Sequence, residues 1–289
     1  MATLGQVVSV GSFSYAAGSG EANFTQAVNM IYTQDLNADG IDEVIFSGFE
    51  TQPNTPSKYS NTQIAIFGWK NGQFQNLTEQ WLPEGLNKVE GVGDISFGDF
   101  NGDGRVDLFL AGYADMEHPV AVYELLNQGT TFTKMALGKA PWQHDSASGD
   151  INHDGYTDVI ATGYGDSPCL YLGSPTGLKV NSLGYVAGGS GVALGKFLGD
   201  GSTSMVLVDH QAWDNKDSAL YRFVTQTDGT VSVQFVAALP KARFDLPKYG
   251  PSSDPLGQSH DIRAINFDFN HDGLDDVIVI SRPAYDGGK

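Results

Sequence analysis

The chain has 289 residues, of which 40% are hydrophobic and 36 are glycine, so it can bury a core and still make many turns. Its formal charge is −18, with 16 Lys and Arg against 34 Asp and Glu. Because nucleic-acid binding relies on basic side chains at phosphates, this balance argues against a nucleic-acid partner. No apolar run reaches the roughly 18 residues that a transmembrane helix needs, so we expect no membrane insertion.

Short runs of branched, aromatic and alternating residues predict β-strands in repeated groups. In chain order these are 29–32, 44–46, 63–67 and 73–74; 94–97, 108–110, 120–123 and 132–133; 159–160, 169–172 and 178–180; 205–208, 219–223 and 231–233; and 262–265 and 277–280. No long amphipathic helix is evident, which favours an all-β fold.

An acidic nine-residue pattern, Asp-x-Asn-x-Asp-Gly-x-x-(Asp/Glu), occurs four times, each time just before an apolar run. Positions 1, 3, 5 and 9 offer side-chain oxygens, position 7 a backbone carbonyl and position 6 a glycine for a sharp turn, which suits calcium. A single copy could be an ordinary turn, but four in register predict about four Ca²⁺ ions. The expected ligands are Asp35, Asn37, Asp39, Ile41 and Glu43; Asp99, Asn101, Asp103, Arg105 and Asp107; Asp150, Asn152, Asp154, Tyr156 and Asp158; and Asp268, Asn270, Asp272, Leu274 and Asp276.

Position 12 of the pattern distinguishes these loops from an EF-hand, which needs a bidentate Glu there on a helix. The four copies have Phe46, Leu110, Ala161 and Val279 at that position, inside predicted strands. Each loop is therefore expected to join two strands.

A fifth, degenerate copy occupies residues 196–201. Lys196 replaces the first carboxylate, and Leu198 and Ser204 replace two further ligands. We expect this loop to hold no ion.

Over residues 28–283 these loops and strands resemble the FG-GAP or VCBS-type repeats of calcium-binding β-propellers, the class that includes the integrin α-subunit head. The resemblance implies one all-β domain over residues 1–289, with four-stranded antiparallel blades and calcium loops between the first and second strands. Four full blades and a partial fifth are expected. The ring is either closed by the N-terminal segment 6–15 or is a piece of a larger propeller, and we favour the piece.

Location and activity are less directly encoded. Residues 1–5 lack the start of a conventional signal peptide. The single cysteine, Cys169, allows no internal disulfide, and bound calcium would stabilise the fold in the way that disulfides do in many secreted domains. Free calcium outside cells would fill even weak sites, so we expect an extracellular or cell-surface protein. His153 and His271, at loop position 4, are expected to be exposed turn residues.

Two functions fit these features. The leading hypothesis is an adhesion or ligand-binding module for a carbohydrate or a cell-surface protein, without catalytic residues. The alternative is a carbohydrate-active enzyme such as a polysaccharide lyase, in which His144 or His260, each followed by Asp, would act as the base at the end opposite the calcium loops.

Overall fold

The computed structural model describes residues 25–51, 59–83, 86–89, 91–113, 119–140, 143–163, 167–183, 186, 189, 191–208, 218–239 and 259–283. Almost every element in these ranges is a β-strand, so the expected all-β class is confirmed. The one described α-helix, α1 (Thr78–Trp81), is a single turn, and no helix in the described part of the chain is long and apolar enough to cross a membrane.

The strands form five antiparallel sheets, four of which contain four consecutive strands. Sheet 1 has β1 (Thr25–Gln34), β2 (Glu43–Thr51), β3 (Tyr59–Lys70) and β4 (Gln73–Asn76), with β5 (Lys88–Val89) beside β3. Sheet 2 has β6 (Val92–Gly98), β7 (Asp107–Gly112), β8 (Val120–Asn127) and β9 (Phe132–Ala140). Sheet 3 has β10 (Gln143–Gly149), β11 (Asp158–Gly163), β12 (Cys169–Leu172) and β13 (Lys179–Asn181). Sheet 4 has β14 (Gly191–Gly195), β15 (Ser204–Val208), β16 (Ala219–Thr225) and β17 (Val231–Ala238). Sheet 5 has β18 (Ser259–Phe267) and β19 (Asp276–Pro283).

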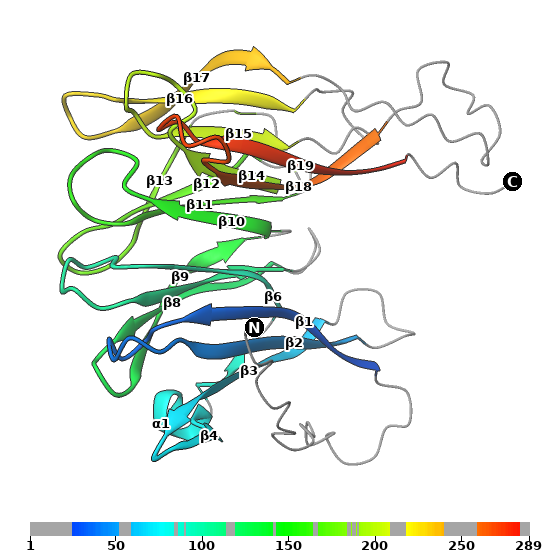
Figure 1. The fold of residues 1–289 in the computed structure, drawn as a ribbon, viewed down its shortest axis with the longest axis vertical. Coiled ribbons are helices and arrows are strands. Elements are labelled where there is room, and N and C mark those ends of the chain that lie inside the picture. The colour runs from blue at the N-terminus through cyan, green and yellow to red at the C-terminus, as the bar shows by residue number, and fades with distance from the viewer. Residues whose placement is uncertain are drawn as a thin grey trace, which may run out of the picture.

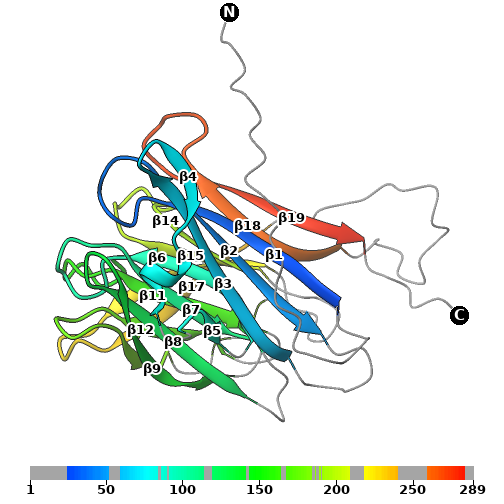
Figure 2. The ribbon, with the colours of Figure 1, turned by 90° about the horizontal axis from the view of Figure 1, so that it is seen from below.

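The sheets are stacked through their first strands. β6 lies against β10, β10 against β14, and β14 against β18. Figure 1 shows sheet 1 at the bottom of this array and sheet 4 at the top, and Figure 2 shows the array from below. The composition of the sheets is consistent with propeller blades, but the described strands do not close a ring.

Buried side chains fill the space between neighbouring sheets. In β7, Leu108 and Leu110 pack toward sheet 1, whereas Phe109 packs toward sheet 3. In β11, Ile160 packs toward sheet 4 and Val159 toward sheet 2. Because both faces of these strands are covered, they are continuous apolar runs rather than alternating ones.

Several strand boundaries differ from the predictions. β10 and β14 were not predicted as strands, because they contain few of the branched and aromatic residues that mark strands. In β10 the small polar residues have partners in sheet 2: the hydroxyl of Ser148 donates to the carbonyl of Phe97 over 2.7 Å. β9 is nine residues long, although only 132–133 was predicted. The N-terminal segment 6–15, considered for ring closure, lies outside the described residues.

Candidate metal centre

The four acidic loops join the first and second strands of sheets 1, 2, 3 and 5. Their hairpins lie at the same end of the array, on the left in Figures 1 and 2. Each loop follows the C-terminal end of the first strand of its sheet, which is β1, β6, β10 or β18. It then leads into a second strand that runs antiparallel to the first.

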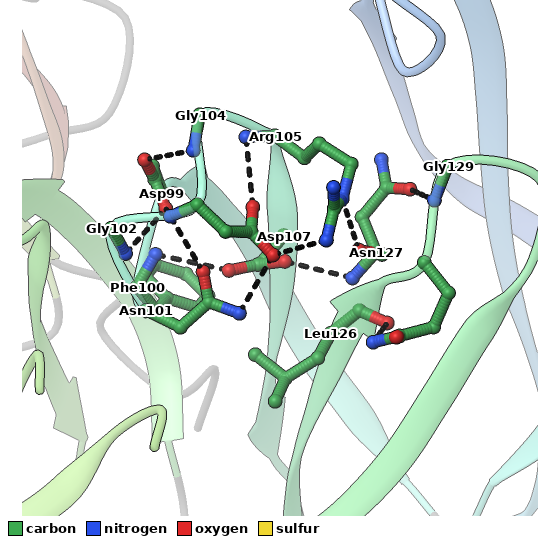
Figure 3. Close-up of polar contacts among 12 residues, drawn as sticks. Asp99, Phe100, Asn101, Gly102, Gly104, Arg105, Asp107, Leu126, Asn127 and Gly129 are labelled. Carbon is green, nitrogen blue, oxygen red and sulfur yellow. Dashed lines mark hydrogen bonds and ion pairs between the residues drawn. The ribbon is translucent and has the colours of Figure 1, made fainter. Parts of the chain in front are cut away.

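All four loops share one pattern of hydrogen bonds, which Figure 3 shows for the second. Asp99 accepts the backbone N–H groups of Asp103 (3.0 Å) and Gly104 (2.8 Å), the fifth and sixth positions. Asn101 Oδ1 accepts the N–H of Asp103 over 3.0 Å, and Asp103 Oδ1 accepts that of Arg105 over 3.0 Å. The same bonds recur in the other three loops. The side chains at positions 1, 3 and 5 are therefore turned inward over the loop.

The backbone of the loops explains two of the residue types. Glycine at position 6 has positive φ in every copy, at 84°, 80°, 89° and 86° in chain order. Position 4 is also left-handed, with φ of 61° at His153 and 59° at His271. Both histidines are exposed, so the interpretation of them as turn residues is confirmed.

The carboxylate at position 9 is buried in the first three loops. Asp107 accepts the N–H groups of Phe100 (3.0 Å) and Asn127 (2.8 Å). Burial raises the pKa of Asp107 to about 6, although these N–H donors lower it, and the neighbouring loop carboxylates raise it further. Burial likewise raises the pKa of Asp158 to about 6 and raises the pKa of Glu43. Three loops thus hold a carboxylate that is costly to ionise beside other carboxylates, and a cation would offset this cost.

The donor chemistry of the loops fits a hard divalent cation. Each loop provides three carboxylates, one amide oxygen and one backbone carbonyl, which is an all-oxygen set. In the part of the chain that the structure describes, no three His, Cys, Asp or Glu side chains form a metal-binding group. The carboxylates accept backbone N–H groups from their own loops, and a carboxylate has further lone pairs to offer a cation.

The second loop also contains a positive charge that the sequence analysis did not use. Arg105 was considered only for its backbone carbonyl, yet its guanidinium pairs with Asp103 Oδ2. The same side chain donates through Nε to the carbonyl of Asn127 over 2.7 Å. A cation entering this loop would compete with the guanidinium for Asp103.

The degenerate fifth loop, between β14 and β15, is held by other interactions. Ser204, at position 9, accepts the N–H of Phe197 through its hydroxyl over 3.3 Å. Asp200 forms an ion pair of 2.7 Å with Arg222 of β16. Hydrogen bonds from Ser202 lower the pKa of Asp200, and Arg222 lowers it further. Arg222 was missed from the sequence because it lies on a different strand.

The candidate bases lie away from these loops. His144 is at the start of β10, opposite the end that enters the third loop, and its ring meets that of Tyr113 edge-on with centroids 4.8 Å apart. The neighbouring Asp145 accepts the N–H of Val192 over 3.0 Å and so links β10 to β14. His260 is paired in register with Arg282, and its side chain is outside the described residues.

Two buried carboxylates outside the loops were also missed. Asp94 accepts the hydroxyl of Tyr32 (2.6 Å) and the N–H of Ser146 (2.8 Å), which ties sheet 2 to both neighbours. Glu124 is fully buried, accepts the N–H of Leu178 over 2.8 Å, and has a pKa raised to about 7, mainly by burial. Neither residue stands in a repeated motif that a single sequence reveals.

Comparison with known proteins agrees with the repeat pattern. The profile of the FG-GAP-like repeat matches residues 35–110 and 99–161. No curated protein sequence matches the chain. Solved structures that match include a rhamnogalacturonan lyase, with a TM-score of 0.39, 13% identity and coverage of 89% of this chain and 56% of that one. The chain thus spans about half the length of that protein.

Proposed function

The profile of the FG-GAP-like repeat matches residues 35–161, and on this basis we propose that the chain is an extracellular, calcium-stabilised β-propeller module that binds a carbohydrate or a cell-surface protein. The oxygen side chains of the four loops support the metal part of this proposal. The ligand part concerns the opposite end of the array, where His144 lies.

The observation that carries the metal proposal is the buried carboxylate at position 9, next to the inward-facing oxygens of positions 1, 3 and 5. Asp107 is fully buried near the carboxylates of Asp99 and Asp103, and Asp158 is fully buried near that of Asp154. The residues that would hold the ions are the four sets at positions 1, 3, 5, 7 and 9 of the loops. Bound calcium would neutralise charge that the protein otherwise keeps in close contact, and would stabilise the folded chain.

Calcium is preferred over other divalent cations for reasons of donor chemistry. The loops contain no cysteine, and their only histidines, at position 4, are exposed, so a site for zinc or copper is not supported. Magnesium demands a rigid octahedral arrangement and retains several waters, whereas calcium accepts irregular sets of carboxylate and carbonyl oxygens.

Calorimetric titration tests the metal proposal. We expect the metal-stripped chain to bind about four Ca²⁺ ions and to bind Mg²⁺ more weakly. Asp103→Asn should remove or weaken one site, whereas the matched control Asp200→Asn, in the degenerate loop, should leave the stoichiometry unchanged. Each site should add about 2.7 kcal/mol of stability when calcium is at a hundred times its dissociation constant. An unchanged melting temperature in excess calcium would contradict the proposal.

The ligand would bind at the end opposite the acidic loops, where His144 lies against Tyr113 at the start of β10. We expect His144→Ala and His260→Ala to weaken binding to a glycan or a cell-surface protein, and Asp103→Ala to act mainly through stability. Equal loss of binding in a folded Asp103→Ala protein would move the functional surface to the loop end. If the chain forms unsaturated products from an acidic polysaccharide, it is an enzyme rather than a binding module.

A further inference from the structure

A path of hydrogen bonds joins the carboxylates at position 9 of the first and second loops. Glu43 Oε2 accepts the N–H of Leu36, at position 2 of the first loop, over 2.9 Å. The carbonyl of Leu36 accepts a hydrogen bond from Nδ2 of Asn127 over 2.8 Å, and Asn127 is the last residue of β8 in sheet 2. The backbone N–H of Asn127 donates to Asp107 Oδ1 over 2.8 Å. Asn127 is fully buried beside the second loop, as Figure 3 shows, and it connects the two loops.

The second and third loops are joined in the same way. Asp107 Oδ2 accepts the N–H of Phe100, again at position 2, over 3.0 Å. The carbonyl of Phe100 accepts the N–H of Ser174, which follows β12 in sheet 3, over 3.1 Å. The adjacent Gly173 donates its N–H to Asp158 Oδ1 over 2.8 Å. The position 9 carboxylates of the first three loops therefore belong to one connected set.

This connected set ends at sheet 4. The degenerate loop has Ser204 at position 9, so it offers no carboxylate to which the path could continue. Sheet 5 packs on sheet 4, and Asp276 in its loop accepts the N–H of Phe269 over 3.1 Å. A sheet without an intact acidic loop thus separates the loop of sheet 5 from the other three.

We propose that calcium binds cooperatively to the loops of sheets 1, 2 and 3, and independently to the loop of sheet 5. The coupling rests on the calcium sites proposed above. In a loop whose position 9 carboxylate is held by an ion, the position 2 backbone is held as well, and with it the donor group on the next sheet. The next loop then loses less conformational entropy when its own ion binds, which is positive coupling.

Electrostatic repulsion between the bound ions opposes this coupling but is screened. Position 5 is exposed in each of the three loops, so the ions would lie near solvent. Packed sheets lie about 10 Å apart, which exceeds the Debye length of about 8 Å at physiological salt. The hydrogen-bonded path is buried at Asn127 and at the carboxylates of Asp107 and Asp158, where salt does not reach it. The coupling is therefore measured at physiological salt.

Calorimetric titration of the metal-stripped chain tests the coupling. In the wild type we expect about three ions to bind cooperatively and about one independently. Asp39→Asn, at position 5 of the first loop, should remove or weaken one site and lower the calcium affinity of the second and third loops by at least about fivefold. The matched control Asp272→Asn, at position 5 of the loop of sheet 5, should affect its own site and leave the other affinities unchanged. Equal effects of the two substitutions on the remaining sites would overturn the proposal.

Asn127→Ala tests the connection between the first and second loops. The substitution removes the side-chain donor to Leu36 and keeps the backbone N–H that donates to Asp107. In this background, Asp39→Asn should no longer change the affinity of the second and third loops, and such a cycle isolates the coupling from the general effect of either change. An undiminished effect would overturn the role of Asn127. Circular dichroism at saturating calcium shows whether each variant is folded. If Asn127→Ala does not fold, the comparison of Asp39→Asn with Asp272→Asn still tests the coupling.

The same titration separates the coupling from the calcium sites themselves. Four ions that bind independently would overturn the coupling alone and leave the calcium sites intact. A chain that binds no calcium would overturn both.

Discussion

Replacing Glu124 with Gln tests whether a buried carboxyl makes folding depend on pH. Glu124 lies on β8 against the β12–β13 connection, where one oxygen accepts the N–H of Leu178 and the other has no hydrogen-bond partner among the described residues. Burial raises its pKa from 4.5 to about 7, and the nearby Asp107 adds to the rise. The carboxyl is therefore neutral in the folded protein at a pH where the unfolded chain ionises it.

The sign of the effect follows from this difference. Because the folded pKa is the higher one, the contribution of Glu124 to stability is fully present below pH 4.5 and is lost as the pH rises through about 7. A difference of that size corresponds to about 3 kcal/mol. Gln is uncharged at every pH, so Glu124→Gln should remove this loss.

Urea denaturation at several pH values, at constant calcium, measures the effect. The free energy of unfolding of the wild type minus that of Glu124→Gln should fall by about 3 kcal/mol between acidic pH and pH 8. Glu79→Gln, at an exposed position of α1, is the matched control and should leave the pH dependence of the wild type unchanged. If Glu124→Gln and the wild type lose stability in parallel as the pH rises, the reasoning about burial is refuted.

Three further predictions concern single residues. Arg105→Gln should tighten one calcium site by about two- to fivefold in a calorimetric titration, because a surface ion pair to Asp103 no longer competes; equal affinity would exclude this competition. His153→Gly should raise the free energy of unfolding by about 0.5–1 kcal/mol, since φ is 61° there, and a loss of stability would show that the ring has a packing role. Gly177→Ala should destabilise the protein by more than about 1 kcal/mol, because φ is 98° and a Cβ would lie 2.5 Å from Glu124 Oε1. That loss should shrink in a Glu124→Ala background, and an unchanged loss would assign it to the backbone alone.

The sequence predicted the loops and the class of fold well, because both are encoded by neighbouring residues. Glycine at position 6 and the oxygen side chains at positions 1, 3 and 5 act within nine residues, so one chain displays the whole pattern. The same holds for hairpin strands such as β7 and β11, whose apolar runs are unbroken. Strands β10 and β14 escaped prediction because their residues are selected by contacts with neighbouring sheets rather than by their own propensity.

What the sequence did not reveal is set by residues far apart in the chain. Asp94 meets Ser146 across 52 positions, and Glu124 meets Leu178 across 54. An aspartate before a loop could equally have been a dyad partner of a histidine, and only the position of β14 shows that Asp145 accepts a backbone N–H there. The exposed face of β18 could not be predicted for the same reason. Ile265 and Phe269 are apolar residues of the kind that is usually buried, and only the arrangement of the sheets shows that nothing in the described chain covers them. Whether a side chain of a repeat is buried, hydrogen-bonded or exposed therefore depends on residues far away in the chain.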